Sequence, residues 1–187
     1  MQDGLQSRFL VTRPSPYTPL NVQFNLPGQH NVLNALAAIA IATELGVSDD
    51  AIVAGLAKFQ GVGRRFQLLG EKDFAKGRAM VIDDYGHHPR EIRSTIDAFR
   101  SVWPQKRLVH VFQPHRYSRT QSLFNDFVEV LGMADEVILL DIYAAGESEI
   151  MGINSAKIAE SVTDRHSNKI HLLGAKDIES ILQEVVQ

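Results

Sequence analysis

The composition is that of a globular protein without disulfides. The chain has 187 residues, of which 44% are hydrophobic and 22% are charged, and it contains no cysteine, which excludes disulfides, thiolate metal ligands and a cysteine nucleophile. Its formal net charge is −3 and no basic block occurs, so the sequence lacks the signature of nucleic-acid or anionic-membrane binding. The longest apolar run, residues 35–42, is far shorter than the roughly 20 residues of a membrane span. We therefore expect a cytoplasmic protein with neither nucleic acid nor membrane as partner.

The first 62 residues predict a small β-rich region followed by helices. Gly46 is expected to end the first helix, and Ser48 is the expected N-cap of the second. We interpret residues 1–62 as the end of a domain that begins elsewhere, and residues 61–63, Gly-Val-Gly, as a joint between domains. The residue pattern predicts strands at 8–12 and 21–26 and helices over 31–45 and directly after Ser48.

From residue 63 onward, predicted strands alternate with predicted helices. Such alternation is typical of βαβ units, so we expect an α/β domain over residues 63–187 with a Rossmann-like, mostly parallel sheet and flanking helices. We also expect this domain to be cut short at its end. The strands are predicted near 66–70, 79–83, 107–112, 136–140 and 169–173, and the helices near 89–101, 118–131, 155–163 and 176–186.

Two polar clusters directly follow two of these predicted strands. Residues 83–89 read Asp-Asp-Tyr-Gly-His-His-Pro, and residues 113–119 read Gln-Pro-His-Arg-Tyr-Ser-Arg. Pro89 suits a first helical turn and Ser118 suits an N-cap, so both clusters should lead into helices. Ligands of open α/β sheets bind beyond the carboxyl ends of the strands. The two clusters therefore indicate one binding or catalytic crevice.

The first cluster is compatible with several kinds of chemistry. Asp83 and Asp84 could bind a metal, accept hydrogen bonds from ribose or act as a base, although adjacent acids also simply form turns. Strand alternation directs only one of the two into the crevice. His87 and His88 suit either metal ligation or hydrogen bonds to a substrate or nucleotide, and Tyr85 either stacks on a base or packs.

The second cluster predicts an anion subsite. A guanidinium group binds carboxylate or phosphate in a planar fork, and Arg116 and Arg119 lie three residues apart where a helix begins, next to His115. The alternative is a weak ion pair with an acidic residue of the chain: Asp83, Glu91 or Asp126.

Asn31 and Asn34 form a third candidate group, one helical turn apart. Their amides donate and accept hydrogen bonds, as recognition of an adenine edge requires. The alternative is that Asn31 is an N-cap and Asn34 is solvated. No G-x-x-x-x-G-K-[ST] phosphate-binding loop occurs in the sequence.

Four motifs of this chain together resemble the Mur ligase family. The resemblance covers essentially the whole chain and is closest to the members that join L-alanine to UDP-N-acetylmuramate; a murein peptide ligase is a less similar alternative. It implies that residues 1–62 are the C-terminal part of the central ATP-binding domain and that residues 63–187 are the amino-acid-receiving domain. The motifs are Leu-Pro-Gly-Gln-His-Asn-Val-Leu-Asn-Ala-Leu-Ala-Ala at 26–38, Gly-Arg-Arg-Phe at 63–66, the cluster at 83–89 and the run at 112–120.

The resemblance also implies an activity and a set of site residues. ATP phosphorylates the muramate carboxylate, and the amine of L-alanine attacks the acyl phosphate in peptidoglycan precursor synthesis, which supports the cell wall, cell shape and cell division. Mg²⁺ ligands are expected mainly upstream, and no residue of this chain is assigned as catalytic or as a metal ligand. The implied ATP-binding residues are Asn31, Asn34, Arg65, Asp84 and Tyr85; the implied L-alanine-binding residues are His87, His88, His115, Arg116 and Arg119.

Because the sequence has no phosphate-binding loop, we expect no ligase turnover from this chain alone. Two other classes of function fit the clusters. One is a metal-dependent phosphoesterase, which would need a further ligand such as Asp141 besides the acids and histidines at 83–88. The other is a non-catalytic regulatory domain with a doubly wound fold.

Overall fold

The computed structural model describes residues 2–166, 169–173, 180 and 182, and its contacts divide the chain into two compact units. The first unit comprises Met1–Gln67 and Ser94–Lys106, and the second comprises Leu68–Arg93 and Arg107–Gln187. The helix predicted near 176–186 lies outside the described residues, apart from 180 and 182. In the described part of the chain, no helix is long and apolar enough to cross a membrane.

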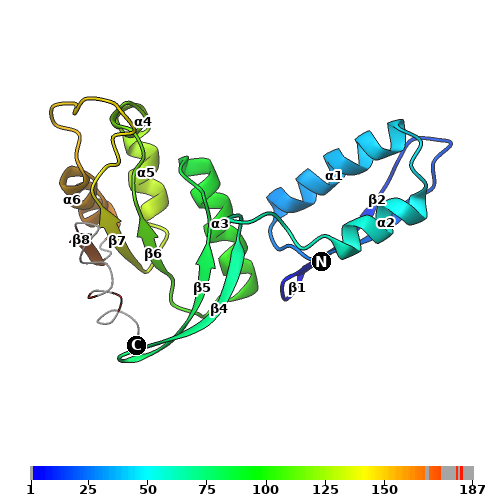
Figure 1. The fold of residues 1–187 in the computed structure, drawn as a ribbon, viewed down its shortest axis with the longest axis horizontal. Coiled ribbons are helices and arrows are strands. Elements are labelled where there is room, and N and C mark those ends of the chain that lie inside the picture. Colours follow the sequence, from blue (N-terminus) through cyan, green and yellow to red (C-terminus); the bar gives the residue numbers. More distant parts are fainter. Residues whose placement is uncertain (1, 167–168, 174–179, 181, 183–187) are drawn as a thin grey trace. The chain divides into compact units, whose positions relative to one another are not determined.

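The first unit contains a small antiparallel sheet and two helices (Figure 1). The sheet has the order β1-β2-β3, and its residue pairs include Val11 with Leu20 and Ser7 with Phe24. These elements confirm the predicted order of strands and helices. Their bounds are β1 Gln2–Asp3, β2 Gln6–Val11, β3 Leu20–Phe24, α1 Gln29–Glu44 and α2 Asp49–Lys58.

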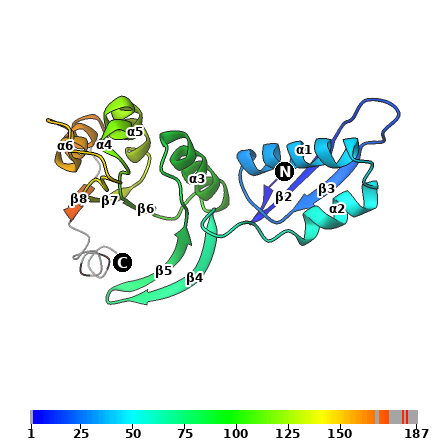
Figure 2. The ribbon, with the colours of Figure 1, turned by 45° about the horizontal axis from the view of Figure 1, so that its top comes forward.

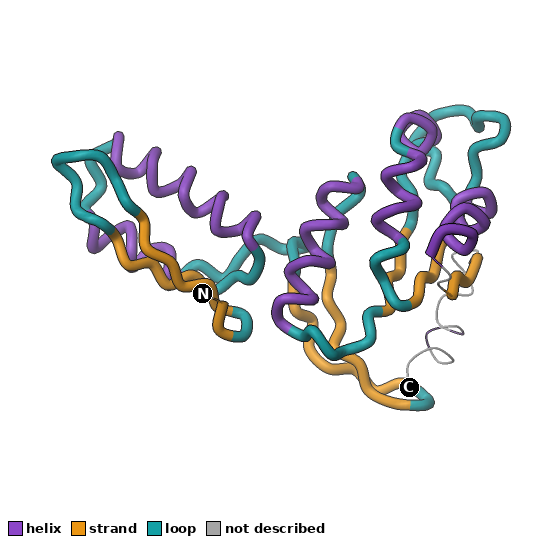
Figure 3. The backbone as a smooth tube through the Cα atoms, turned by 180° about the vertical axis from the view of Figure 1, so that it is seen from behind, coloured by secondary structure: helices purple, strands orange, loops and turns teal. Residues whose placement is uncertain are grey.

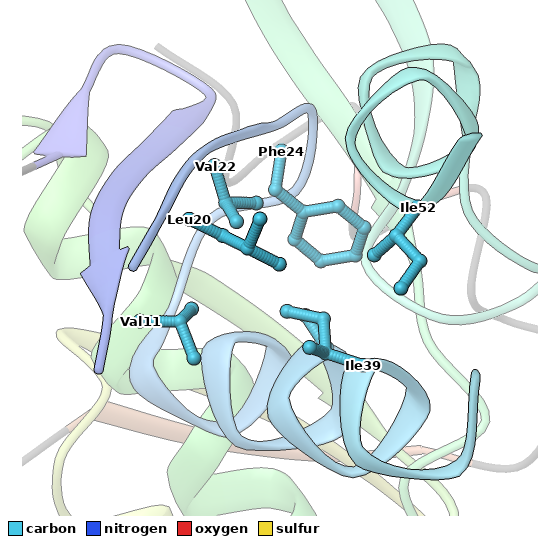
Figure 4. Close-up of a cluster of buried hydrophobic side chains, with 7 residues drawn as sticks. Val11, Leu20, Val22, Phe24, Ile39 and Ile52 are labelled. Carbon is cyan, nitrogen blue, oxygen red and sulfur yellow. The ribbon is translucent and has the colours of Figure 1, made fainter. Parts of the chain in front are cut away.

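Both helices contribute to one hydrophobic core beneath this sheet. Alternate residues of β3 are buried, as period-two alternation requires, and they meet Ile39 of α1 and Ile52 of α2. Figure 4 shows these side chains pointing toward one another. The buried members of this core are Val11, Leu20, Val22, Phe24, Ala35, Ile39 and Ile52.

Local signals in the sequence set the ends of these helices. Gly46 follows the C-cap of α1 with φ 73°, in the left-handed region that glycine adopts readily. The Ser48 hydroxyl accepts a hydrogen bond from the Ala51 N–H at 3.4 Å and caps α2, as predicted. The Asp49 carboxylate, in the first turn of α2, accepts bonds from both terminal nitrogens of Arg13 at 2.8 and 2.6 Å. These contacts join the loop between β2 and β3 to the start of α2.

The second unit contains a parallel sheet with the order β6-β7-β8 (Figure 2). β7 is its central strand, and all five of its residues are buried. The parallel sheet and its flanking helices confirm the predicted α/β fold class. The strands are β6 Val109–Phe112, β7 Glu136–Leu140 and β8 Lys169–Leu173, and the helices are α4 Tyr117–Ser122, α5 Phe124–Leu131 and α6 Ser155–His166. A further helix, α3 Pro89–Val102, begins in this unit, and its residues from Ser94 onward belong to the first unit.

Two features of this unit differ from the sequence prediction. β4 (Gln67–Phe74) and β5 (Gly77–Asp83) form a two-stranded sheet of their own (Figure 3). Only two residues connect them, which permits an antiparallel hairpin but not a parallel crossover. The single helix predicted over 118–131 is divided at Leu123, whose φ of −115° is not helical. The polar cluster after β6 therefore leads into a helix of only six residues, α4.

Candidate functional site

The first polar cluster begins with a tight turn at the end of β5. An oxygen of Asp84 accepts a hydrogen bond from the Gly86 N–H at 2.7 Å. A Cβ atom on Gly86 would lie 2.8 Å from this same oxygen, so a larger residue would disturb the turn. The structure thus gives Asp84 a turn-forming contact, and one oxygen of its carboxylate is engaged in it.

The two histidines of the cluster are fixed at the start of α3 by Glu91. One Glu91 oxygen accepts hydrogen bonds from the backbone N–H groups of His87 and His88, each at 3.0 Å. His88 Nδ1 in turn accepts from the Arg90 N–H at 3.2 Å, an exchange similar to a capping box. Burial raises the pKa of Glu91, but the two N–H donors and the nearby imidazoles outweigh burial and place the pKa below its ordinary value.

These contacts give the two imidazoles opposite hydrogen-bonding characters. Because His88 Nδ1 accepts, the neutral ring carries its proton on Nε2 and presents a donor there. His87 Nδ1 lies 3.1 Å from the Tyr85 carbonyl oxygen, which can only accept, so this nitrogen carries the proton and neutral His87 presents an acceptor at Nε2. Adjacent residues thus supply one donor and one acceptor.

The structure brings the two predicted clusters together. The rings of His87 and His115 are 6.2 Å apart, Tyr85 lies 5.2 Å from His87, and Tyr143 lies 5.2 Å from His115. Tyr143 follows β7, and its backbone forms a parallel bridge with His115 beyond the strand ends. Three loops after β5, β6 and β7 therefore contribute to one row of rings. The sequence analysis missed Tyr143, although its place after a predicted strand was a usable signal.

His115 is held as a neutral imidazole. Its Nδ1 atom is buried and has no hydrogen-bond partner among the described residues. Burial lowers the pKa of His115, and the positive charges of Arg119 and Arg116, together with that of His87 whenever its ring is protonated, lower it further against an opposing effect of Glu147. A neutral ring beside two guanidinium groups leaves the positive charge of this cluster on the arginines.

The two arginines occupy different structural positions. Arg116 precedes α4 with φ 73°, and its N–H donates to the Tyr143 carbonyl at 2.8 Å. Arg119 lies in α4 and donates from Nη1 to the His115 carbonyl at 3.3 Å. The prediction that Ser118 is the N-cap is wrong, because α4 begins one residue earlier, at Tyr117.

The acidic residue nearest to Arg116 is one that the sequence analysis did not consider. Glu147, in the loop after β7, lies 3.9 Å from Arg116 Nη1 and accepts hydrogen bonds from the Ser118 N–H and hydroxyl at 2.9 and 2.7 Å. The Ser118 hydroxyl and N–H lower the pKa of Glu147, and Arg116 adds to this effect. No sequence pattern predicts the contact between Glu147 and Ser118, because 29 residues separate them.

His110 of β6 is a further titratable residue that the sequence analysis missed. Its Nδ1 atom is buried and has no hydrogen-bond partner among the described residues. Burial lowers the pKa of His110 to about 4, although the negative charge of Asp84 opposes this effect. β6 therefore carries a neutral histidine whose pKa responds to the charge of Asp84 in the first cluster.

The remaining candidates lie in the first unit. Asn31 is not the N-cap of α1, because Gly28 holds that position and Asn31 Nδ2 donates to the Pro27 carbonyl at 2.8 Å. Asn34 is exposed one turn farther along α1. Arg65 is also exposed, and its N–H donates to the Val62 carbonyl at 3.2 Å. Asp84 and Tyr85, by contrast, belong to the second unit.

The described residues include no group of three or more histidine, aspartate or glutamate side chains that could hold a metal ion. The phosphoesterase alternative requires such a group near residues 83–88. It therefore gains no support from the described part of the chain.

Comparison with known proteins identifies relatives along the whole chain. Residues 64–187 match the family profile described as Mur ligase, glutamate ligase domain. The UDP-N-acetylmuramate–L-alanine ligase of Legionella pneumophila strain Corby is 59% identical over 186 residues, covering 100% of this chain and 39% of that protein. The chain thus spans well under half the length of the curated relatives that it matches.

Solved structures with the same fold include two at 25% identity or more. UDP-N-acetylmuramate-alanine ligase MurC of Thermotoga maritima has a TM-score of 0.69 and 30% identity, covering 91% of this chain and 34% of that one. The murein peptide ligase of Psychrobacter arcticus has a TM-score of 0.65 and 25% identity, covering 100% of this chain and 38% of that one.

Proposed function

Because the chain belongs to the Mur ligase family, we propose that it is part of an ATP-dependent ligase that joins L-alanine to UDP-N-acetylmuramate. The observation that carries this proposal is the 59% identity to curated L-alanine ligases over the whole chain. The solved murein peptide ligase is only 25% identical, so that alternative is less favoured. The reaction belongs to peptidoglycan precursor synthesis, and we place it in the cytoplasm, where a cysteine-free chain needs no oxidising compartment.

We assign residues 1–62 to the central ATP-binding domain and residues 63–187 to the amino-acid-receiving domain. Nucleotide contact is assigned to Asn31, Asn34 and Arg65 of the first unit and to Asp84 and Tyr85 of the second. The amide oxygen of Asn31 can accept a hydrogen bond from a ligand while its nitrogen donates to the Pro27 carbonyl, and Asn34 is exposed. We assign no Mg²⁺ ligand to the described residues.

The second unit supplies the chemistry for the incoming amino acid. Arg116 and Arg119 bind its carboxylate, and neutral His115 beside them leaves the positive charge on the guanidinium groups. The Nε2–H of His88 offers a further donor to the carboxylate, and Nε2 of neutral His87 offers an acceptor to the amino group. These contacts would hold the amine in line with the acyl carbon, and such positioning supplies several kcal/mol of a reaction barrier.

In the proposed step, formation of the amide bond is matched by loss of phosphate. The amine nitrogen forms a bond to the acyl carbon, the bond from that carbon to the phosphate oxygen breaks, and the departing phosphate takes up the proton that the nitrogen loses. Developing negative charge on the tetrahedral intermediate and on the phosphate needs nearby cations. Within the described second unit, Arg116 and Arg119, at the start of α4, are the cations placed beside the cluster.

Phosphate release by a longer chain, with the region that precedes these residues in the relatives restored, tests the proposal. Release that requires ATP, Mg²⁺, UDP-N-acetylmuramate and L-alanine together is the expected result. Arg119→Ala should raise KM for L-alanine without changing KM for ATP. Arg165→Ala is the matched control, because Arg165 pairs with Glu129 and donates to Asn125, each at 3.0 Å, and neither partner belongs to a polar cluster. Release that requires a peptide in place of L-alanine would refute the assignment.

A further inference from the structure

Glu147 makes several polar contacts with the segment that carries the arginine pair. Its two carboxylate oxygens accept from the Ser118 N–H at 2.9 Å and the Ser118 hydroxyl at 2.7 Å, and one of them lies 3.9 Å from Arg116 Nη1. Its side chain is 25% exposed, whereas that of Arg116 is 51% exposed. The carboxylate is therefore the less exposed partner of this pair, and two hydrogen bonds to Ser118 hold it in place.

These contacts stabilise a backbone conformation that few residues adopt. Arg116 has φ 73°, and a non-glycine residue in the left-handed region costs about 1–2 kcal/mol. The backbone on both sides is also tied to the loop after β7, since the Arg116 N–H donates to the Tyr143 carbonyl and the Tyr143 N–H donates to the Pro114 carbonyl, each at 2.8 Å. The Glu147 side chain adds a further connection between that loop and the first turn of α4.

The charge of Glu147 changes what the arginine pair can bind. Arg116 and Arg119 together carry two positive charges, and the pKa of Glu147 is lowered by Ser118 and Arg116, so its carboxylate is ionised at neutral pH. Glu147 thus balances one guanidinium and leaves one positive charge for a ligand carboxylate. Glu149 and Asp141 also act on Tyr117 of α4, whose pKa is raised by burial and by their negative charges. A ligand with a second carboxylate would meet acidic groups here.

We propose that Glu147 is a positioning residue for the amino-acid subsite, one that fixes Arg116 and restricts the subsite to amino acids with a single carboxylate. This inference rests on the proposed function, because it takes the arginine pair as the site of the amino-acid carboxylate. It assigns the selectivity for amino acids with a single carboxylate to Glu147, which lies in the loop after β7 and outside both polar clusters of the sequence.

Glu147→Gln in the longer chain is the direct test, because glutamine retains the shape and one acceptor oxygen but removes the charge. We expect KM for L-alanine to rise about tenfold, the scale of one lost charge-assisted contact, with KM for ATP unchanged. We also expect the ratio of kcat/KM for L-aspartate to that for L-alanine to rise. A general loss of structure would lower kcat/KM for L-aspartate and for L-alanine alike and would leave their ratio unchanged. Glu129→Gln, which removes an exposed carboxylate paired with Arg165, is the matched control and should leave all parameters unchanged.

The outcomes separate this inference from the proposed function. L-alanine-dependent phosphate release by the unaltered longer chain supports the function, whatever the variant does. A Glu147→Gln enzyme with an unchanged KM for L-alanine and an unchanged aspartate-to-alanine ratio would refute the role of Glu147. If that variant does not fold, Ser118→Ala removes the 2.7 Å hydroxyl contact and keeps the carboxylate. It should raise KM for L-alanine by a smaller factor, and no rise would equally refute the inference.

Discussion

Replacement of His110 by glutamine should remove much of the acid sensitivity of the second unit. The pKa of His110 is lowered from 6.5 to about 4 by burial, so the folded state binds this proton less readily than the unfolded state. The resulting stability is present in full above pH 6.5 and is lost as the pH falls toward 4. A difference of about 2.5 pKa units corresponds to at most about 3 kcal/mol at about 1.4 kcal/mol per unit.

Urea unfolding followed through amide signals of β7, at several values between pH 7 and pH 4, measures this loss within the second unit. The unaltered chain should lose up to about 3 kcal/mol more than His110→Gln over this range. In Asp84→Asn, the pKa of His110 measured by NMR should fall further, because the charge of Asp84 raises it. Parallel stability curves for the unaltered chain and His110→Gln would show that burial of this imidazole does not govern the acid response.

Other predictions concern packing, capping and turnover. A Cβ on Gly132 would lie 2.3 Å from two ring atoms of His166, so Gly132→Ala should destabilise the chain by about 1–3 kcal/mol in urea unfolding, and His166→Ala in the same chain should relieve part of this cost. Ser48→Ala should lower stability by about 1 kcal/mol through loss of the α2 cap, seen as a lower Tm. The 187-residue chain by itself should release no phosphate with all substrates present, and measurable release would contradict the need for a phosphate-binding loop.

The elements that could be predicted are those with local signals. The cap of α2 at Ser48 and the end of α1 before Gly46 could be predicted, because each of these residues acts within one turn of itself. The hairpin of β4 and β5 could not be predicted, because the connection Ala75-Lys76 lacks the Asn-Gly or Asp-Gly signal of a tight turn. The break at Leu123 also has no local signal, since neither proline nor glycine accompanies it.

The candidate site shows the same division between local and distant causes. The polar residues that follow two predicted strands led us to expect that the two clusters would meet. The rings of His87 and His115, one from each cluster, are 6.2 Å apart. The partner of Arg116 could not be found in this way, because Glu147 reaches it from a loop that includes Ala145 and Gly146 at positive φ. Such a loop path depends on tertiary contacts rather than on residue periodicity. A carboxylate that contacts the arginine segment from 29 or more residues away is therefore visible only in the folded chain.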